Sequence, residues 1–249
     1  MSTSPLLVVE HEKDCPPGWM GEWLEDAGVV LDVRRPYAGD ALPEDLTGHA
    51  GLLVLGGDMG ADDDATHPWL TRVKVLIRSA ADTRVPTLGI CLGHQLCAVA
   101  LGGVVIPNPH GKQVGLLDVG WTEAAARDRL VAGLPRPAGG VQWNSDIVVD
   151  VPEGTVSLAS TPTGALQAAR FAPTVWGVQW HPEVGEEILE LWAEHGRDDA
   201  AARGIDLDAC IRDVAQATPR LRETWALLAD GFAVLLREGA RVDSWTPAG

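Results

Sequence analysis

The sequence lacks any apolar run long enough to cross a bilayer. Its uninterrupted apolar stretches, such as 29–31 and 51–55, are short, whereas a membrane-spanning helix needs about 20 residues. No basic residue precedes the first apolar stretch, 6–9, so the N-terminus does not have the pattern of a secretory signal. We therefore expect a cytoplasmic protein.

Cysteine and basic residues are also scarce. The four cysteines, Cys15, Cys91, Cys97 and Cys210, include no C-x-x-C pair, which disfavours a zinc knuckle or a thioredoxin-type motif. Only 19 Lys and Arg face 35 Asp and Glu, and the net charge of −16 repels nucleic acids and anionic membranes. The acidic run 62–64 is typical of a solvated loop. We expect neither a metal site nor a nucleic-acid or membrane partner.

Apolar residues are plentiful but divided into short segments. Hydrophobic residues make up 46% of 249 residues, enough for a full core. In the first half, short apolar runs alternate with stretches of helical periodicity, which predicts an α/β fold with a mostly parallel sheet and crossover helices. The predicted strands are 6–10, 29–33, 51–55 and 85–90, and the predicted helices lie within 16–27, 68–81 and 93–101.

The second half has a different pattern. Short strands separated by turn residues are predicted at 114–119, 147–149, 156–159, 165–171 and 175–179. From residue 184 to about 238 the pattern becomes helical, and one face of this segment carries Leu221, Trp225, Leu228 and Phe232.

The segment Gly89-Ile90-Cys91-Leu92-Gly93 carries the strongest chemical signal. A nucleophile between two glycines, after a buried strand and before a helix, has the form of a nucleophile elbow, in which a crowded turn requires small neighbours. The N-terminus of the following helix favours negative charge and therefore the thiolate. An inert buried cysteine is the alternative reading of this segment taken alone.

A second segment, Gln179-Trp180-His181-Pro182-Glu183, supplies what a thiol nucleophile needs. A nucleophile requires a base, and the base requires an acceptor that orients it. His181 and Glu183 are two residues apart at the end of a predicted strand, so their side chains lie on one face and can hydrogen-bond. The sequence therefore predicts a Cys91-His181-Glu183 triad.

Together, G-I-C-L-G-H-Q at 89–95, W-H-P-E at 180–183 and the glycine-rich loop 56–60 closely resemble class I glutamine amidotransferases. Within that family the chain is most similar to stand-alone, GMP-synthase-like amidotransferase proteins. The resemblance implies a three-layer, flavodoxin-like fold with a mostly parallel central sheet and C-terminal helices. We expect residues 1–184 to form the amidotransferase domain and 185–249 a helical extension packed on it.

The resemblance also implies roles for individual residues. Cys91 would attack a γ-glutamyl amide, His181 would move protons, and Glu183 would hold the imidazole. The family's oxyanion hole falls on the backbone N–H groups of Gly57 and Leu92, and no metal or organic cofactor is required. The resemblance places substrate contacts at Met59, Gln95, Asn144, Ser145 and Asp146, although related stand-alone proteins often have His-Gly-Asp in place of 144–146.

Three functions remain open on these grounds. The leading one is a glutaminase or amidotransferase subunit that releases ammonia from glutamine for a synthetase on another chain. The second keeps the triad but cuts γ-glutamyl amide bonds of peptides, as a γ-glutamyl peptidase or hydrolase. The third is a non-catalytic regulatory module on the same scaffold, which the intact triad disfavours. The sequence leaves the oligomeric state and the role of the C-terminal helices undetermined.

Overall fold

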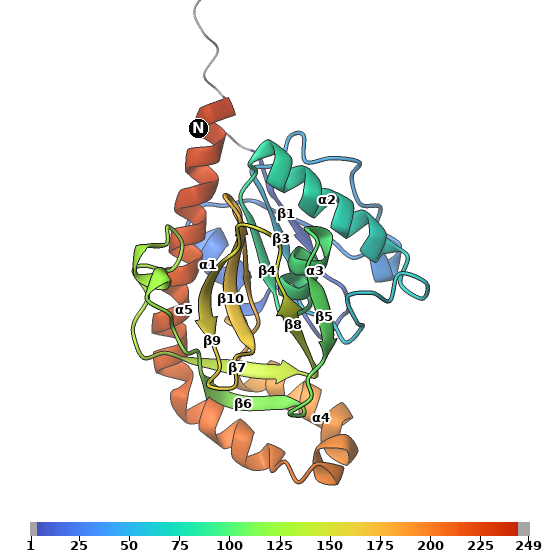
Figure 1. Ribbon diagram of the computed structural model, residues 1–249, viewed down its shortest axis with the longest axis vertical. Helices are drawn as coiled ribbons and strands as arrows, with labels where there is room; N and C mark the ends of the chain where they lie inside the picture. Colours follow the sequence, from blue (N-terminus) through green and yellow to red (C-terminus); the bar gives the residue numbers. More distant parts are fainter. Residues whose placement is uncertain (1–3, 244–249) are drawn as a thin grey trace, which may run out of the picture.

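A 7-stranded sheet forms the centre of the molecule, in the order β2-β1-β3-β4-β11-β10-β9 (Figure 1). The computed structural model describes residues 4–243, with side chains described as far as residue 239. The parallel strands are β2 (Leu31–Arg34), β1 (Leu6–Val9), β3 (Gly51–Val54), β4 (Thr87–Ile90) and β11 (Val175–Val178). Two antiparallel strands, β10 (Leu166–Ala172) and β9 (Val156–Ser160), complete the sheet.

Side-chain alternation along the central strands creates two separate cores. Leu6 and Val8 belong to one buried cluster, whereas Leu7 and Val9 belong to another. Because successive side chains of a strand point to opposite faces, β1 is buried on both sides. A strand that is apolar on both faces requires helices above and below the sheet.

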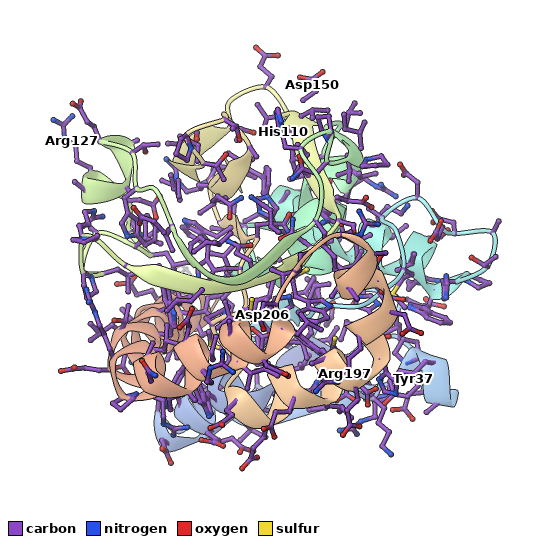
Figure 2. All side chains as sticks on the ribbon, turned by 90° about the horizontal axis from the view of Figure 1, so that it is seen from below. Tyr37, His110, Arg127, Asp150, Arg197 and Asp206 are labelled. Carbon is purple, nitrogen blue, oxygen red and sulfur yellow. The ribbon has the colours of Figure 1, made fainter. Side chains whose placement is uncertain are left out.

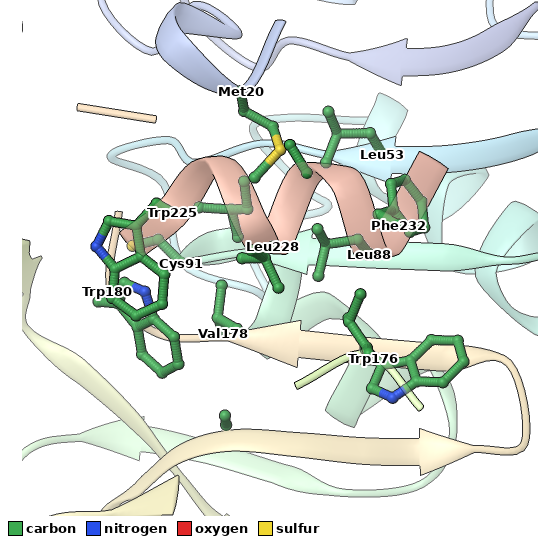
Figure 3. Packing of buried hydrophobic residues seen from close by; sticks show 14 of the residues in the cluster. Met20, Leu53, Leu88, Cys91, Trp176, Val178, Trp180, Trp225, Leu228 and Phe232 are labelled. Atoms are coloured by element: carbon green, nitrogen blue, oxygen red, sulfur yellow. The ribbon is translucent and has the colours of Figure 1, made fainter. Parts of the chain in front are cut away.

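Helices supply both covering layers. Helices α2 (Trp69–Thr83) and α3 (Leu92–Ala100) cover one face, and α1 (Gly18–Asp26) and α5 (Leu207–Asp243) cover the other. Figure 3 shows Trp225, Leu228 and Phe232 of α5 packed near Met20 of α1 and Leu53 of β3. The parallel strands follow the flavodoxin-like order 2-1-3-4-5. The predicted three-layer, mostly parallel α/β fold is confirmed.

Two small antiparallel ribbons lie beside the main sheet. Strands β6 (Gln113–Asp118) and β7 (Gly139–Asn144) form one, and β5 (Val104–Pro107) and β8 (Asp146–Asp150) form the other. Sequence patterns did not predict β5 or β7. Most of β5 is solvent-exposed, and β7 begins with two glycines, so neither has the apolar alternation of a half-buried strand. The short 3₁₀ helices are η1 (Pro36–Ala38) and η2 (Ala124–Arg127).

The C-terminal region forms two helices, α4 (Glu186–Ala202) and α5. The predicted apolar face of α5 is buried in the same cluster as strand residues. Figure 1 shows α5 along one side of the molecule and α4 at its lower end, near β6 and β7. The division at residue 184 stays a prediction, and residues 244–249 of the proposed extension lie outside the described residues. Within 4–243, no helix is both long and apolar enough to cross a membrane.

Candidate active site

Cys91 lies in the sharp turn between β4 and α3, with φ 51° and ψ −105°. This is a left-handed φ that non-glycine residues seldom adopt. A Cβ on Gly89 would clash with the backbone of Gly93, and one on Gly93 would clash with the carbonyl of Val54. Positions 89 and 93 must therefore both be glycine, and the turn places Cys91 at the wall of a cavity.

His181 follows β11 and is held from several sides. Its Nδ1 lies 2.7 Å from Oε1 of Glu183, and the two side chains are only 2% and 1% exposed. Its backbone N–H donates to the carbonyl of Val141 in β7 at 2.8 Å. The ring of Trp192 from α4 packs edge-on against the imidazole, with centroids 4.7 Å apart. These contacts fix both the position and the orientation of the imidazole ring.

The charges around His181 favour its protonated form. Burial by itself lowers the pKa of His181, but the negative charges of Glu183 and Cys91 outweigh it and raise the pKa to about 10. Since Nδ1 is engaged by Glu183, Nε2 is the ring nitrogen available to the thiol, and it has no other hydrogen-bond partner among the described residues. Gly56 lies against both residues: a Cβ added to it would be 3.0 Å from Cε1 of His181 and 3.7 Å from Cβ of Cys91. The imidazole ring and Cys91 are therefore close to each other.

A cavity of about 520 Å³ opens at this triad. Cys91, His181 and Gly57 line it. The backbone N–H groups of Gly57 and Leu92 make no hydrogen bond within residues 4–243, and that of Leu92 is free because it lies in the first turn of α3. Unpaired N–H groups beside a nucleophile are suited to an oxyanion.

Of the residues expected to contact substrate, Ser145 lines the cavity. Gln95 is buried, and its amide nitrogen lies 3.3 Å from Oε1 of Gln179, which in turn points its Nε2 at Sγ of Cys91 from 3.6 Å. Asn144 donates to Oε1 of Gln113 at 3.1 Å. Gln95 and Asn144 are therefore engaged with protein groups, and their substrate roles stay predictions.

Met59 and Asp146 lie near the site without being among the cavity-lining residues of the described chain. The sulfur of Met59 packs 2.6 Å from the point that a Cβ on Gly57 would occupy, so Met59 supports the glycine-rich loop. Burial, followed by the charge of Asp63, raises the pKa of the Asp146 carboxyl. Their contacts with substrate also stay predictions.

Besides Lys112 and Trp143, sequence reasoning missed two groups of cavity residues. The first is Glu12, Asp14 and Cys15, in the loop after β1; the rule that sites lie at the carboxyl ends of parallel strands could have found them. The second comes from α4 and the turn after it, and comprises Trp192, His195, Gly196, Asp199 and Arg203. Residues 195, 199 and 203 share a helical face by their spacing, but a charged helical face is usually a solvated one. Figure 2 views this end of the molecule, with α4 in front.

The family model and the similar sequences point to the same protein family. The family model "Glutamine amidotransferase class-I" matches residues 24–188. The glutamine amidotransferase-like protein YfeJ of Salmonella typhimurium is 31% identical over 212 residues, covering 84% of this chain and 87% of that protein. A glutamine-hydrolysing GMP synthase subunit of Methanosarcina barkeri is 35% identical, covering 58% and 72%. Gamma-glutamyl peptidase 5 of Arabidopsis thaliana is 27% identical, covering 65% of each chain.

Solved structures give the same fold. A glutamine amidotransferase from Thermotoga maritima superposes with a TM-score of 0.83, covering 94% of this chain and 99% of that one. At 23% sequence identity this likeness concerns the fold alone. It includes the C-terminal helices, because the matched share of the chain extends well beyond the residues of the family model.

Proposed function

Since the chain belongs to the glutamine amidotransferase class-I family, we propose that it hydrolyses the side-chain amide of glutamine through a thioester on Cys91. The observation that carries the proposal is the buried His181–Glu183 pair beside a cysteine held at φ 51° on a cavity wall. A protonated imidazole next to a cysteine favours the thiolate form, which is the nucleophile.

The chemistry would proceed in two halves. The Cys91 thiolate attacks the γ-carbonyl carbon, and the N–H groups of Gly57 and Leu92 bind the resulting oxyanion, each contributing about 3 kcal/mol in the transition state. His181 donates its Nε2 proton to the departing amine, which leaves as ammonia when the substrate is glutamine. His181 then takes a proton from water, and the hydroxide so formed cleaves the thioester to release glutamate and the thiolate. Glu183 keeps Nδ1 protonated throughout.

We further propose that the released ammonia serves a synthetase on a separate chain. The support is the M. barkeri relative, which is named as one subunit of a glutamine-hydrolysing GMP synthase. The second candidate function is γ-glutamyl peptidase activity with the same triad. It is favoured by the size of the cavity, which exceeds the needs of an ammonia leaving group, and by the A. thaliana relative.

The test is release of ammonia and glutamate from glutamine by the purified chain, together with mass spectrometry of an acid-quenched reaction. We expect a glutamyl adduct on Cys91 and loss of turnover in Cys91→Ala. Cys210→Ala, at a partly exposed cysteine, should retain activity. Turnover that survives in Cys91→Ala, or no adduct on Cys91 with either glutamine or a γ-glutamyl peptide, would contradict the proposal.

A further inference from the structure

The cavity extends from the nucleophile to α4, and its far wall has no role in the chemistry described above. Its volume of about 520 Å³ lies within the range of roughly 300–1,000 Å³ found for sites that enclose small organic ligands. Ammonia leaving from glutamine needs only an exit path. A larger leaving group would occupy the region between Cys91 and α4.

Trp143, at the end of β7, forms the flat part of this wall. Its ring lies 5.8 Å from that of Trp192, centroid to centroid. A Cβ on Gly196 would lie 2.9 Å from Cζ2 of Trp143, so α4 has a glycine where the ring approaches it most closely. A glycine inside a helix costs about 1 kcal/mol relative to alanine, and here it leaves room for an aromatic surface facing the cavity.

One cation lies beside this ring, and a second is linked to it through a shared carboxylate. Nζ of Lys112 lies 4.7 Å from the Trp143 ring centroid and 3.7 Å from Oδ2 of Asp199. Arg203 contacts the other oxygen of the same carboxylate, with Nε 2.7 Å from Oδ1. Lys112 and Arg203 thus share one carboxylate, and among the described residues they are the Lys and Arg side chains that line the cavity.

Apart from Asp199, the carboxylates of the cavity come from other segments. Glu12 and Asp14 belong to the loop after β1, and Asp58 belongs to the loop after β3. Oδ2 of Asp14 lies 3.9 Å from Nδ1 of His195. His195 belongs to α4 and precedes Asp199 by one helical turn. The cavity therefore has an acidic zone along the β1 and β3 loops and a cationic zone at Lys112 and Arg203. The cationic zone is complementary to a carboxylate on a ligand.

We infer that the wall formed by Lys112, Trp143 and Arg203 is a leaving-group subsite, and that the preferred substrates are γ-glutamyl amides whose amine carries a carboxylate, that is, γ-glutamyl amino acids. The inference rests on the proposed γ-glutamyl amide chemistry at Cys91. The carboxylate of the leaving amino acid accepts from the N–H groups of Lys112 and Arg203 that Asp199 does not engage, and its side chain packs on the Trp143 ring. Glutamine fills only the part of the cavity near Cys91.

Three substrates test the subsite: glutamine, γ-glutamyl-leucine, and γ-glutamyl-leucine with its carboxylate converted to a carboxamide. We expect kcat/KM to favour the free carboxylate over the carboxamide by about tenfold, the value of one charge-assisted hydrogen bond. Lys112→Met and Arg203→Gln should each remove most of this preference while leaving glutamine turnover within about twofold. Lys112→Arg should restore it.

Arg197→Gln is the matched control, because Arg197 lies in α4 (Figure 2), the helix that ends just before Arg203, but pairs with Asp208 at 3.1 Å and does not line the cavity. Arg197→Gln should leave kcat/KM unchanged for all three substrates. Cys91-dependent glutamine turnover with no preference for the carboxylate overturns the subsite and leaves the proposed function standing. Equal losses on glutamine and dipeptide also overturn it, because the cations then act on the glutamyl part.

A binding measurement separates the two proposals. Calorimetry with Cys91→Ala protein compares the two forms of γ-glutamyl-leucine without turnover. Tighter binding of the free carboxylate, lost in the Cys91→Ala/Lys112→Met double variant, supports the subsite even where no substrate is hydrolysed and the proposed function has failed. Equal binding of the two forms overturns it.

Discussion

Replacing Glu183 by glutamine tests the charge relation at the centre of the site. In the wild-type protein, Oε1 of Glu183 lies 2.7 Å from Nδ1 of His181. Glutamine keeps the size of the side chain and an oxygen that can accept from this Nδ1, but it removes a buried negative charge. Removing one partner of a buried ion pair costs roughly 3–5 kcal/mol. Because the amide oxygen still accepts a hydrogen bond, we expect the lower end of that range, about 3 kcal/mol, near neutral pH.

The loss should depend on pH in a definite direction. Burial lowers the pKa of His181, but Glu183 and Cys91 raise it to about 10 in the folded protein, above the ordinary value of 6.5. A raised histidine pKa contributes stability that is fully present below pH 6.5 and is lost as pH rises through about 10. Glu183→Gln removes a large part of that contribution. The difference in stability between wild type and variant should therefore shrink as pH rises from 7 towards 10.

Urea unfolding at several pH values measures this difference, with Glu190→Gln as the control at an exposed carboxylate of α4. Turnover should fall by roughly 10²–10⁴-fold in Glu183→Gln, the usual range for disabling acid–base catalysis. A stability difference that is constant from pH 7 to 10, or glutamine turnover within threefold of wild type, would refute the reasoning. The control should match wild type in both assays.

Three further substitutions follow from the geometry. Gly93→Ala should lower the free energy of unfolding by about 3 kcal/mol or more, because the new Cβ would meet the backbone of Val54. Gly133→Ala is the control, since its Cβ would have no atom within 4 Å, and it should leave urea unfolding unchanged. Equal effects of the two substitutions would contradict this. Trp192→Phe keeps a ring against His181 but removes the indole N–H that donates to the backbone carbonyl of Asp14 at 2.8 Å. The free energy of unfolding should therefore fall by about 1 kcal/mol. An unchanged urea midpoint would argue against a contribution from that hydrogen bond. Gly196→Ala should displace the Trp143 ring, because the new Cβ would lie 2.9 Å from its Cζ2, and should therefore slow cleavage of γ-glutamyl dipeptides more than of glutamine. Equal slowing would count against an aromatic leaving-group wall.

The nucleophile elbow could be predicted because its geometry restricts the sequence severely. Cys91 at φ 51° requires a turn in which neither Gly89 nor Gly93 can carry a side chain. The His181 and Glu183 pair could be predicted because two residues in extended chain fix the relation of their side chains. The central strands were readable for the same reason, since burial on both faces leaves continuous apolar runs.

The far wall of the cavity could not be read in the same way. His195, Asp199 and Arg203 have the spacing of a helical face, but in sequence they are indistinguishable from a charged, solvated surface. Lys112 and Trp143 come from segments about 30 residues apart, one of them a strand that begins with two glycines and has no clear alternation. Only the tertiary arrangement of β6, β7 and α4 brings these side chains to one wall.

The position of this wall in the chain suggests how substrate choice can vary within a shared fold. The family model ends at residue 188, so it includes Cys91 and His181, whereas Asp199 and Arg203 lie beyond it. The elbow tolerates almost no change, because each flanking glycine has backbone at contact distance. Helix α4 is constrained mainly on its buried side, at Leu189, Trp192 and Ala193, and its cavity-facing polar residues can change without loss of core packing. If this wall is the proposed leaving-group subsite, substitutions on this face would alter the leaving group accepted while leaving the proposed thiol chemistry intact.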